Sequence, residues 1–323
     1  MDKLVLFLDE VHPILEERLI ALGMRTVHDY TSSFEALAPE LPKYQGVVIR
    51  SRIPLNNAFL EACSNLEFIA RSGAGLENID TDYCEARKIH LFSAPEGNMD
   101  AVGEHAIAML LSLFNKLNQA DAQVRSGAWN REENRGVELM GKTVGIIGFG
   151  HMGQAFARRL TGFGVEVIAY DPRVPQSKLG RMVSLKELKA EADVVSLHTP
   201  LTEATDGMVD FEFLTGFKKP FYLINTARGQ IVKTSDLLKA LEEGMVLGAC
   251  LDVLEYETSS FTNLFIDKAI PKDFQSLLNH KKVIFSPHVA GWTHESYRKL
   301  SEVLAEKVEN HYSAHSSSTP ERI

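Results

Sequence analysis

The stretch from Thr143 to Asp171, TVGIIGFGHMGQAFARRLTGFGVEVIAYD, constrains the fold more than any other part of the chain. It begins with a short apolar, β-branched run, after which Gly148, Gly150 and Gly153 form the pattern G-x-G-x-x-G. The first glycine permits a tight turn, the second lets backbone approach a pyrophosphate, and the third lets a helix pack close to the strand. The stretch therefore predicts a strand, a phosphate-binding turn, a helix whose free N–H groups face the phosphates, and a second strand.

An acidic residue ends the second strand, since Asp171 stands 23 residues after Gly148. A carboxylate at this position accepts hydrogen bonds from both hydroxyls of an adenosine ribose and repels a 2′-phosphate. It therefore favours NAD over NADP as the cofactor. Glycine-rich turns also occur as plain connections between a strand and a helix. Here, however, the strand, the helix and the acid all stand where the dinucleotide-binding fingerprint needs them.

Composition narrows the class of protein further. A chain of 323 residues is long enough for two domains that each bury a core. A net charge of -9, without a basic run, argues against a nucleic-acid or anionic-membrane partner. The first residues lack a basic signal-peptide start, and no apolar stretch is long enough to span a membrane. Cys63, Cys84 and Cys250 lack metal-type or C-x-x-C spacing, which predicts buried thiols in a reducing cytoplasm and no metal site.

Apolar runs alternate with helix-like segments along most of the chain. Strands are expected at 4–8, 46–49, 66–70, 90–94, 143–148, 166–170, 192–198, 222–225, 247–251 and 283–285. The alternation predicts an α/β fold with two doubly wound parallel-sheet domains. One is a Rossmann NAD-binding domain over residues 100–292. The other is a flavodoxin-like substrate domain over 1–99 and 293–323.

Two long helices are predicted in addition to those that alternate with the strands. A helix at 100–118 is apolar around most of its circumference, which predicts burial between domains or subunits. It is followed by a helix end and an exposed polar loop that carries Trp129. A tail helix at 295–311 has apolar positions that suit packing on the first domain.

Three polar residues stand where apolar strands end: Arg228, Glu257 and His288. Hydride transfer between an alcohol carbon and nicotinamide needs a base for the hydroxyl proton, and imidazole suits this task near neutral pH. Glu257 is the candidate that would fix the tautomer of His288, and Arg228 the candidate that would clamp a substrate carboxylate. Each residue alone also fits an ordinary structural role, because spacing in the sequence does not show that the three converge.

The segments GFGHMG, INTARGQIV, GACLDVLEYE and SPHVAGWT, in this order and spacing, closely resemble the D-isomer-specific 2-hydroxyacid dehydrogenase family. The resemblance covers nearly the whole chain, including RSGAGLENID and GNMDAVGEHAIAMLL. It implies that Arg228, Glu257 and His288 are the catalytic residues. It also implies a homodimer formed through the nucleotide domain, which would account for the apolar helix 100–118.

The same resemblance implies the residues that contact cofactor and substrate. The cofactor set, to which Pro200 is added from its place after a predicted strand, is Gly148, Gly150, His151, Met152, Gly153, Asp171, Pro200, Thr226, Ala227, Arg228, Asp252, His288 and Gly291. The loop whose backbone amides would hold a substrate carboxylate contains Ser72, Gly73, Ala74 and Gly75, and Asn98 joins this substrate-binding set. Substrate is expected to bind between the domains.

The substrate itself is predicted from Arg50, Ser51 and Arg52, which follow a strand of the first domain. This stretch resembles 3-phosphoglycerate dehydrogenases, in which the Arg-Ser-Arg helps to hold the substrate phosphate. The favoured reaction is therefore oxidation of 3-phosphoglycerate to 3-phosphohydroxypyruvate, at the start of serine biosynthesis. The arginines also fit solvated surface charge, which leaves reductases of hydroxypyruvate, glyoxylate or pyruvate as alternatives. An alternative of another class is an NAD(H)-sensing protein similar to transcriptional corepressors of this fold.

Two departures from the family pattern carry expectations of their own. Thr258 stands where many relatives have proline, and the segment 258–280 is long and contains Phe261, Phe265 and Phe274. We expect this segment to cover the cleft or to join an interface. The chain stops after the tail helix, so a serine-sensing regulatory domain is not expected.

Overall fold

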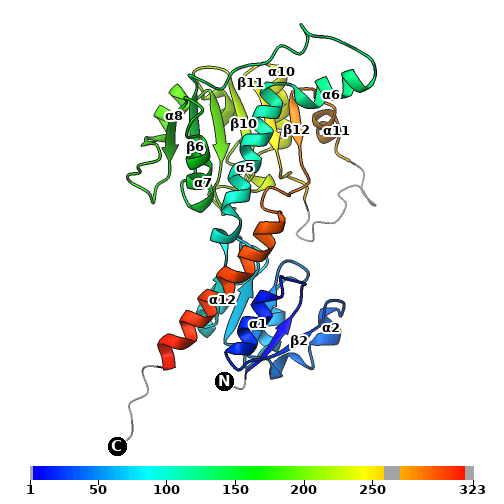
Figure 1. The fold of residues 1–323 in the computed structure, drawn as a ribbon, viewed down its shortest axis with the longest axis vertical. Helices are drawn as coiled ribbons and strands as arrows, with labels where there is room; N and C mark the ends of the chain where they lie inside the picture. Colours follow the sequence, from blue (N-terminus) through cyan, green and yellow to red (C-terminus); the bar gives the residue numbers. More distant parts are fainter. Residues whose placement is uncertain (1–2, 258–269, 317–323) are drawn as a thin grey trace, which may run out of the picture. The chain divides into compact units, whose positions relative to one another are not determined.

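The computed structural model describes residues 3–257 and 270–316 and divides the chain into two compact units. Unit 1 comprises residues 1–98 and 292–323, and unit 2 comprises residues 99–291. Each unit contains one parallel sheet with its own helices (Figure 1). The strand order is β2-β1-β3-β4-β5 in unit 1 and β12-β11-β10-β9-β6-β7-β8 in unit 2. The predicted α/β fold with two doubly wound sheets is confirmed.

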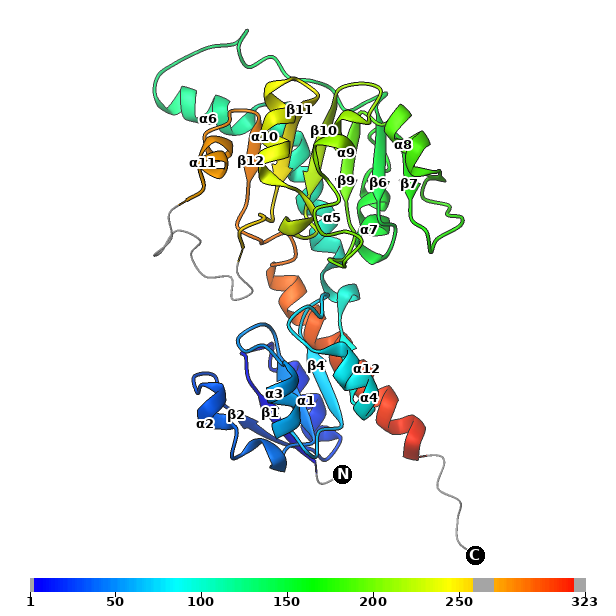
Figure 2. The ribbon, with the colours of Figure 1, turned by 180° about the vertical axis from the view of Figure 1, so that it is seen from behind.

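Unit 1 has a flavodoxin-like sheet, visible in Figure 2. Its strands are β1 (Leu4–Phe7), β2 (Arg25–His28), β3 (Gly46–Ile49), β4 (Phe68–Arg71) and β5 (His90–Ser93). Its helices are α1 (Ile14–Ala21), α2 (Phe34–Leu37), η1 (Leu41–Lys43), α3 (Asn57–Ala62) and α4 (Thr81–Arg87). All four residues of β3 are buried, as expected for a central parallel strand covered on both faces.

The tail helix α12 (His294–Ser316) packs on unit 1, as predicted. Leu300, Leu304 and Val308 follow one another at helical spacing and are buried in one cluster with Val5 and Phe68 of the sheet. The chain therefore returns to unit 1 to complete its core.

Unit 2 has the Rossmann order of strands. These are β6 (Thr143–Ile147), β7 (Glu166–Tyr170), β8 (Arg181–Met182), β9 (Val194–Leu197), β10 (Phe221–Asn225), β11 (Val246–Leu251) and β12 (Val283–Phe285). Its helices are α6 (Leu117–Arg125), α7 (His151–Arg159), α8 (Leu185–Glu191), α9 (Phe211–Thr215), η2 (Gly229–Ile231), α10 (Thr234–Glu242) and α11 (Lys272–Leu278). Side chains of β9 alternate between two core clusters, with Val194 in one and Val195 in the other.

The predicted apolar helix is α5 (Pro95–Phe114), which begins and ends earlier than expected. Ala106, Leu110 and Phe114 recur every four residues and are buried against the sheet of unit 2. The apolar face that these three residues form is therefore buried within unit 2. Lys116, in the left-handed region with φ 51°, separates α5 from α6.

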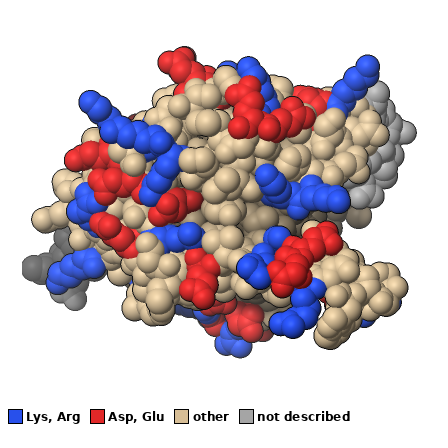
Figure 3. Space-filling model, turned by 90° about the horizontal axis from the view of Figure 1, so that it is seen from above, with Lys and Arg blue, Asp and Glu red and all other residues tan. Residues whose placement is uncertain are grey.

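On the face drawn in Figure 3, basic and acidic side chains are interspersed, so that neither sign dominates it. Within residues 3–257 and 270–316, no helix is long and apolar enough to cross a membrane.

Candidate active site

The glycine turn between β6 and α7 has the geometry that its sequence predicts. Gly148 has φ +89°, which side-chain-bearing residues rarely adopt. A Cβ on Gly153 would lie 2.1 Å from the carbonyl oxygen of Gly148, so that only glycine lets α7 pack this close. A Cβ on Gly150, in contrast, would meet nothing within 4 Å. The turn is therefore closed on the protein side and open where a pyrophosphate would approach.

The carboxylate of Asp171 is anchored to this turn. One oxygen, Oδ2, accepts a hydrogen bond of 2.7 Å from the Phe149 amide, and Oδ1 accepts one of 2.8 Å from the Arg173 amide. Each oxygen keeps a further acceptor site for a ribose hydroxyl. Asp171 thus stands at the carboxyl end of β7 in the position that favours NAD.

Two buried hydroxyls at neighbouring strand ends have no hydrogen-bond partner within the described part of the chain. They belong to Thr199, after β9, and Thr226, after β10. Buried hydroxyls are normally paired, so these two fit polar groups of a bound dinucleotide. Thr226 is one of the predicted cofactor contacts, whereas Thr199 was not predicted. Next to Thr199, burial lowers the pKa of His198 to about 3, which keeps that imidazole neutral.

A histidine–carboxylate pair lies within unit 2. His288 Nδ1 is 2.7 Å from Oε2 of Glu257, and the other carboxylate oxygen of Glu257 accepts a hydrogen bond from the amide of Leu254. The contact at Nδ1 fixes the orientation of the imidazole ring and favours the tautomer with its proton on Nδ1. His288 has φ +54°, an unusual backbone conformation for a histidine and one that often occurs at functional positions.

Asp252 fixes the turn that carries His288. It is 1% exposed, and its backbone oxygen accepts a 2.7 Å hydrogen bond from the His288 amide. Its carboxylate accepts from the Ser286 hydroxyl at 2.6 Å and from the amides of Val289 and Ala290, both at 2.9 Å. Sequence reasoning predicted Asp252 as a cofactor contact. The structure also gives it a positioning role, since both carboxylate oxygens accept hydrogen bonds from this turn, while Oδ2, with one bond from the Ala290 amide, keeps a further acceptor site.

The turn that carries Arg228 is held by residues that sequence reasoning missed. The side-chain amide of Asn225 donates to the Arg228 carbonyl at 2.9 Å, and its oxygen accepts from the Ala227 amide at 3.1 Å. A Cβ on Gly229 would lie 1.9 Å from the Leu254 carbonyl oxygen. This contact brings the chain after β10 against the segment that leads to Glu257. The signals that would have identified Asn225 and Gly229 are a polar residue at the end of a strand and a glycine four residues later.

In unit 1, the predicted carboxylate-binding loop offers fewer amides than its sequence implies. The amide of Ser72 donates to Ile49, and that of Gly73 donates to Arg71. Among the described residues, the amides of Ala74 and Gly75 have no partner. The Arg71 guanidinium lies so close to Gly73 that a Cβ there would be 1.6 Å from Nη1. Arg71, missed in the sequence, therefore borders this loop.

The two arginines after β3 differ sharply in their surroundings. Arg52 donates from Nε, Nη1 and Nη2 to the carbonyls of Leu8, Ser32 and Asp29, at 2.6, 2.7 and 2.8 Å. Its guanidinium therefore links three backbone segments. Because these carbonyls occupy its donors, Arg52 is disfavoured as a ligand for a second anion. Arg50 instead lies over the Trp292 ring, with Cζ 4.1 Å from the ring centroid.

The remaining predicted residues occupy the following places. His151 is exposed at the first position of α7, Met152 follows it half-buried, Pro200 is exposed after β9, Gly291 is the last residue of unit 2, and Asn98 has a buried side-chain oxygen without a partner among the described residues. Phe274 is buried in α11, whereas Phe261 and Phe265 lie outside the described residues.

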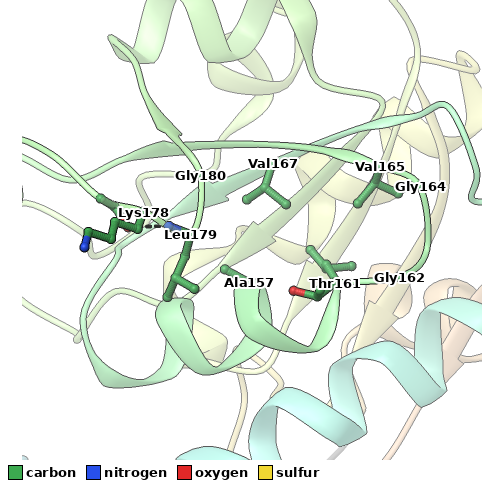
Figure 4. A pocket seen from close by; sticks show the side chains of 11 residues that line it. Ala157, Thr161, Gly162, Gly164, Val165, Val167, Lys178, Leu179 and Gly180 are labelled. Carbon is green, nitrogen blue, oxygen red and sulfur yellow. Dashed lines mark hydrogen bonds between the residues drawn. The ribbon is translucent and has the colours of Figure 1, made fainter.

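A hollow of about 430 Å³ lies elsewhere in unit 2 (Figure 4). Thr161, Val165, Lys178 and Leu179 contribute to its wall, between the end of α7 and the chain before β8. It is near the start of β7, whereas Asp171 follows the end of that strand, so it is distinct from the dinucleotide turn. Within the described ranges, no group of three or more His, Cys, Asp or Glu side chains could hold a metal ion.

Comparison with known proteins agrees with this geometry. Residues 107–290 match the family model described as D-isomer specific 2-hydroxyacid dehydrogenase, NAD binding domain. The chain is 36% identical, over 92% of its length and 56% of the relative's, to D-3-phosphoglycerate dehydrogenase of Archaeoglobus fulgidus. It is 34% identical to hydroxypyruvate reductase of Thermotoga maritima, over 83% of this chain and 85% of that one.

A solved structure with a similar fold is the D-lactate dehydrogenase of Aquifex aeolicus complexed with NAD and lactic acid. It has a TM-score of 0.82 and 29% identity, and the match covers 96% of both chains. The present chain spans about half the length of the phosphoglycerate dehydrogenases that it matches.

Proposed function

Because the chain belongs to the D-isomer specific 2-hydroxyacid dehydrogenases, we propose that it is an NAD-dependent oxidoreductase that interconverts 3-phosphoglycerate and 3-phosphohydroxypyruvate. The observation that carries this proposal is the His288–Glu257 pair, in the same unit as the dinucleotide turn. Arg50 supplies the positive charge for a second anionic group.

The roles follow from the geometry of each residue. Glu257, on Nδ1, holds His288 in the tautomer whose Nε2 accepts the hydroxyl proton of the substrate. NAD, when bound, supplies the acceptor for the hydride that leaves C2. Loss of the proton and the hydride converts the alcohol into the ketone. We assign the substrate carboxylate to Arg228.

The substrate is tested by following NADH absorbance across a panel. We expect 3-phosphoglycerate with NAD to give the highest kcat/KM, above hydroxypyruvate, glyoxylate or pyruvate with NADH. Arg50→Ala should raise KM for 3-phosphoglycerate at least about tenfold, because it removes a charge-assisted contact. Arg52→Lys is the matched control, since its side chain faces backbone carbonyls.

The panel also decides between the alternatives. Preference for hydroxypyruvate would favour the second candidate, which the match to the Thermotoga maritima reductase supports, and would contradict the phosphorylated substrate. Absence of turnover with every acid, although NADH binds, would indicate an NAD(H)-sensing protein instead.

We also propose a homodimer, through a surface that includes α6 and the chain that follows it. Several exposed apolar side chains fall in this stretch, since Leu117 and Val124 lie on one face of α6 and Trp129 and Met140 follow in the sequence. Trp129 is 76% exposed. The helix α5, predicted for this role, buries Ala106, Leu110 and Phe114 in unit 2, and we therefore place the proposed surface at residues 117–140.

Replacing Leu117 and Trp129 together by Asp should convert the dimer into a monomer, because charges would enter an apolar interface. Sedimentation velocity measures the change. Leu247→Asp, at an exposed apolar side chain outside residues 117–140, is the control. A dimer that persists in the double variant would contradict this surface.

A cytoplasmic location is the last part of the proposal. Cys63, Cys84 and Cys250 are free and buried, and burial raises the thiol pKa of Cys63 to about 12 and that of Cys84 to about 11. Inert, reduced thiols suit a reducing compartment.

A further inference from the structure

The sheet of unit 1 has its own switch point, where the direction of strand addition reverses. The chain adds β2 on one side of β1 and then β3 on the other. In doubly wound sheets, ligands bind beyond the carboxyl ends of the two strands at such a point. Asp9 follows β1 here, and Arg50 follows β3. Asp9 and Arg50 therefore lie at the edge of the sheet where doubly wound folds bind ligands.

Asp9 fixes the backbone from which Arg50 projects. Its Oδ2 accepts hydrogen bonds from three successive amides, those of Arg50, Ser51 and Arg52, at 2.7, 3.0 and 3.2 Å. Three convergent amides form an anion-binding concavity, which the chain fills with its own carboxylate. A substrate anion is therefore left to the side chain of Arg50 rather than to these amides.

The planar guanidinium of Arg50 lies over the ring of Trp292. Its Cζ lies 4.1 Å from the Trp292 ring centroid, well within the range of a cation–π contact. Within residues 3–257 and 270–316, the backbone amide of Arg50 donates to Asp9, but no hydrogen bond uses the N–H groups of the guanidinium. Burial lowers the pKa of Arg50 below its ordinary value, and the nearby Asp9 opposes this effect. Stacking thus orients the cation while its in-plane donors remain available for two oxygens of an anion.

The Trp292 ring is itself supported by aromatic neighbours in unit 1. Tyr297, in the first turns of α12, meets it edge to face at a centroid distance of 5.9 Å, and His12 meets Tyr297 at 5.7 Å. Because these contacts limit the orientations of the indole, they also limit those of the guanidinium on it.

We propose that Trp292 is a specificity-determining residue, which holds Arg50 so that it binds the second anionic group of the substrate. Asp9 is the positioning residue for the same arginine. This inference rests on the proposed function, because it names the residues that select a phosphorylated acid. Selection of a phosphorylated acid would thus depend on the indole ring of Trp292, the residue at which the chain re-enters unit 1.

The kinetic test replaces the platform and measures KM and kcat with 3-phosphoglycerate and with D-lactate. Trp292→Leu should raise KM for 3-phosphoglycerate about tenfold, the change that corresponds to a cation–π contact near 1.4 kcal/mol. It should leave kcat, and both constants for D-lactate, within about twofold. Trp292→Tyr, which keeps an aromatic face, should restore most of the loss. In an Arg50→Ala background, Trp292→Leu should have no further effect.

A binding test separates this inference from the identity of the substrate. The chain has two tryptophans, so Trp129→Phe leaves Trp292 as the sole indole. Inorganic phosphate should then change its fluorescence, and Arg50→Ala should abolish the change. If this occurs in an enzyme that oxidises only unphosphorylated acids, the anion site stands and the proposed substrate is wrong. If phosphate has no effect and Trp292→Leu lowers kcat equally with both acids, Trp292 is merely structural and the inference is overturned.

Discussion

Replacing His288 by Asn should lower kcat/KM at least about 10³-fold, which corresponds to about 4 kcal/mol of lost transition-state stabilisation. The reason is geometric: Glu257 occupies Nδ1 at 2.7 Å, and the other imidazole nitrogen is the proposed acceptor of the hydroxyl proton. Asparagine keeps a polar side chain of similar reach but cannot accept that proton. Initial rates of NADH formation with saturating NAD measure the effect.

Two controls make this result specific. His294→Asn alters an exposed histidine six residues further along and should leave the rate unchanged. Although His288 is itself a predicted cofactor contact, NADH affinity of the His288→Asn protein should stay within a fewfold of wild type, since the dinucleotide turn is untouched. Glu257→Gln should cause a smaller loss, because it removes the charge but keeps a group on Nδ1. Undiminished activity in the His288→Asn protein would contradict the assigned mechanism.

The strands that sequence reasoning missed are edge strands. The residues of β2, Arg25 to His28, are all exposed or half-buried, so they lack the apolar run that marks a central parallel strand. β8 has two residues, Arg181 and Met182, which is too short for any periodicity. The central strand β3 is apolar along its whole length, and the central strands were predicted within a residue or two. Burial on both faces made the central strands predictable, whereas among the edge strands of the described sheets β5 and β12 were predicted and β2 and β8 were missed.

The site shows the same division between local and long-range information. The glycine turn was predictable because all its constraints lie within one βαβ unit. Arg50 and Arg52 look equivalent in the sequence, yet one lies on Trp292 and the other donates to three backbone carbonyls. Nothing near residue 50 in the sequence indicates a tryptophan at 292. Side-chain partners that depend on tertiary packing of distant segments could not be derived from local patterns.

Replacing Gly153 by Ala should destabilise the fold, whereas replacing Gly150 by Ala should weaken cofactor binding. A methyl group on Gly153 would lie 2.1 Å from the carbonyl oxygen of Gly148. Since backbone cannot yield as a flexible side chain does, we expect a loss of about 3 kcal/mol or more in the free energy of unfolding of unit 2. For a unit of this size, that lowers its melting temperature by about 10 °C.

Gly150→Ala should instead fold normally, because the added methyl meets nothing within 4 Å and the φ of −75° suits alanine. That open space is where we expect the pyrophosphate, so the methyl should weaken NADH binding by at least about tenfold. Differential scanning calorimetry and NADH fluorescence titration, applied to both variants, separate the two effects. A Gly150→Ala protein with wild-type affinity would mean that the dinucleotide does not approach the turn at this glycine. Normal stability in Gly153→Ala would show that α7 can move away from the strand, which the 2.1 Å approach argues against.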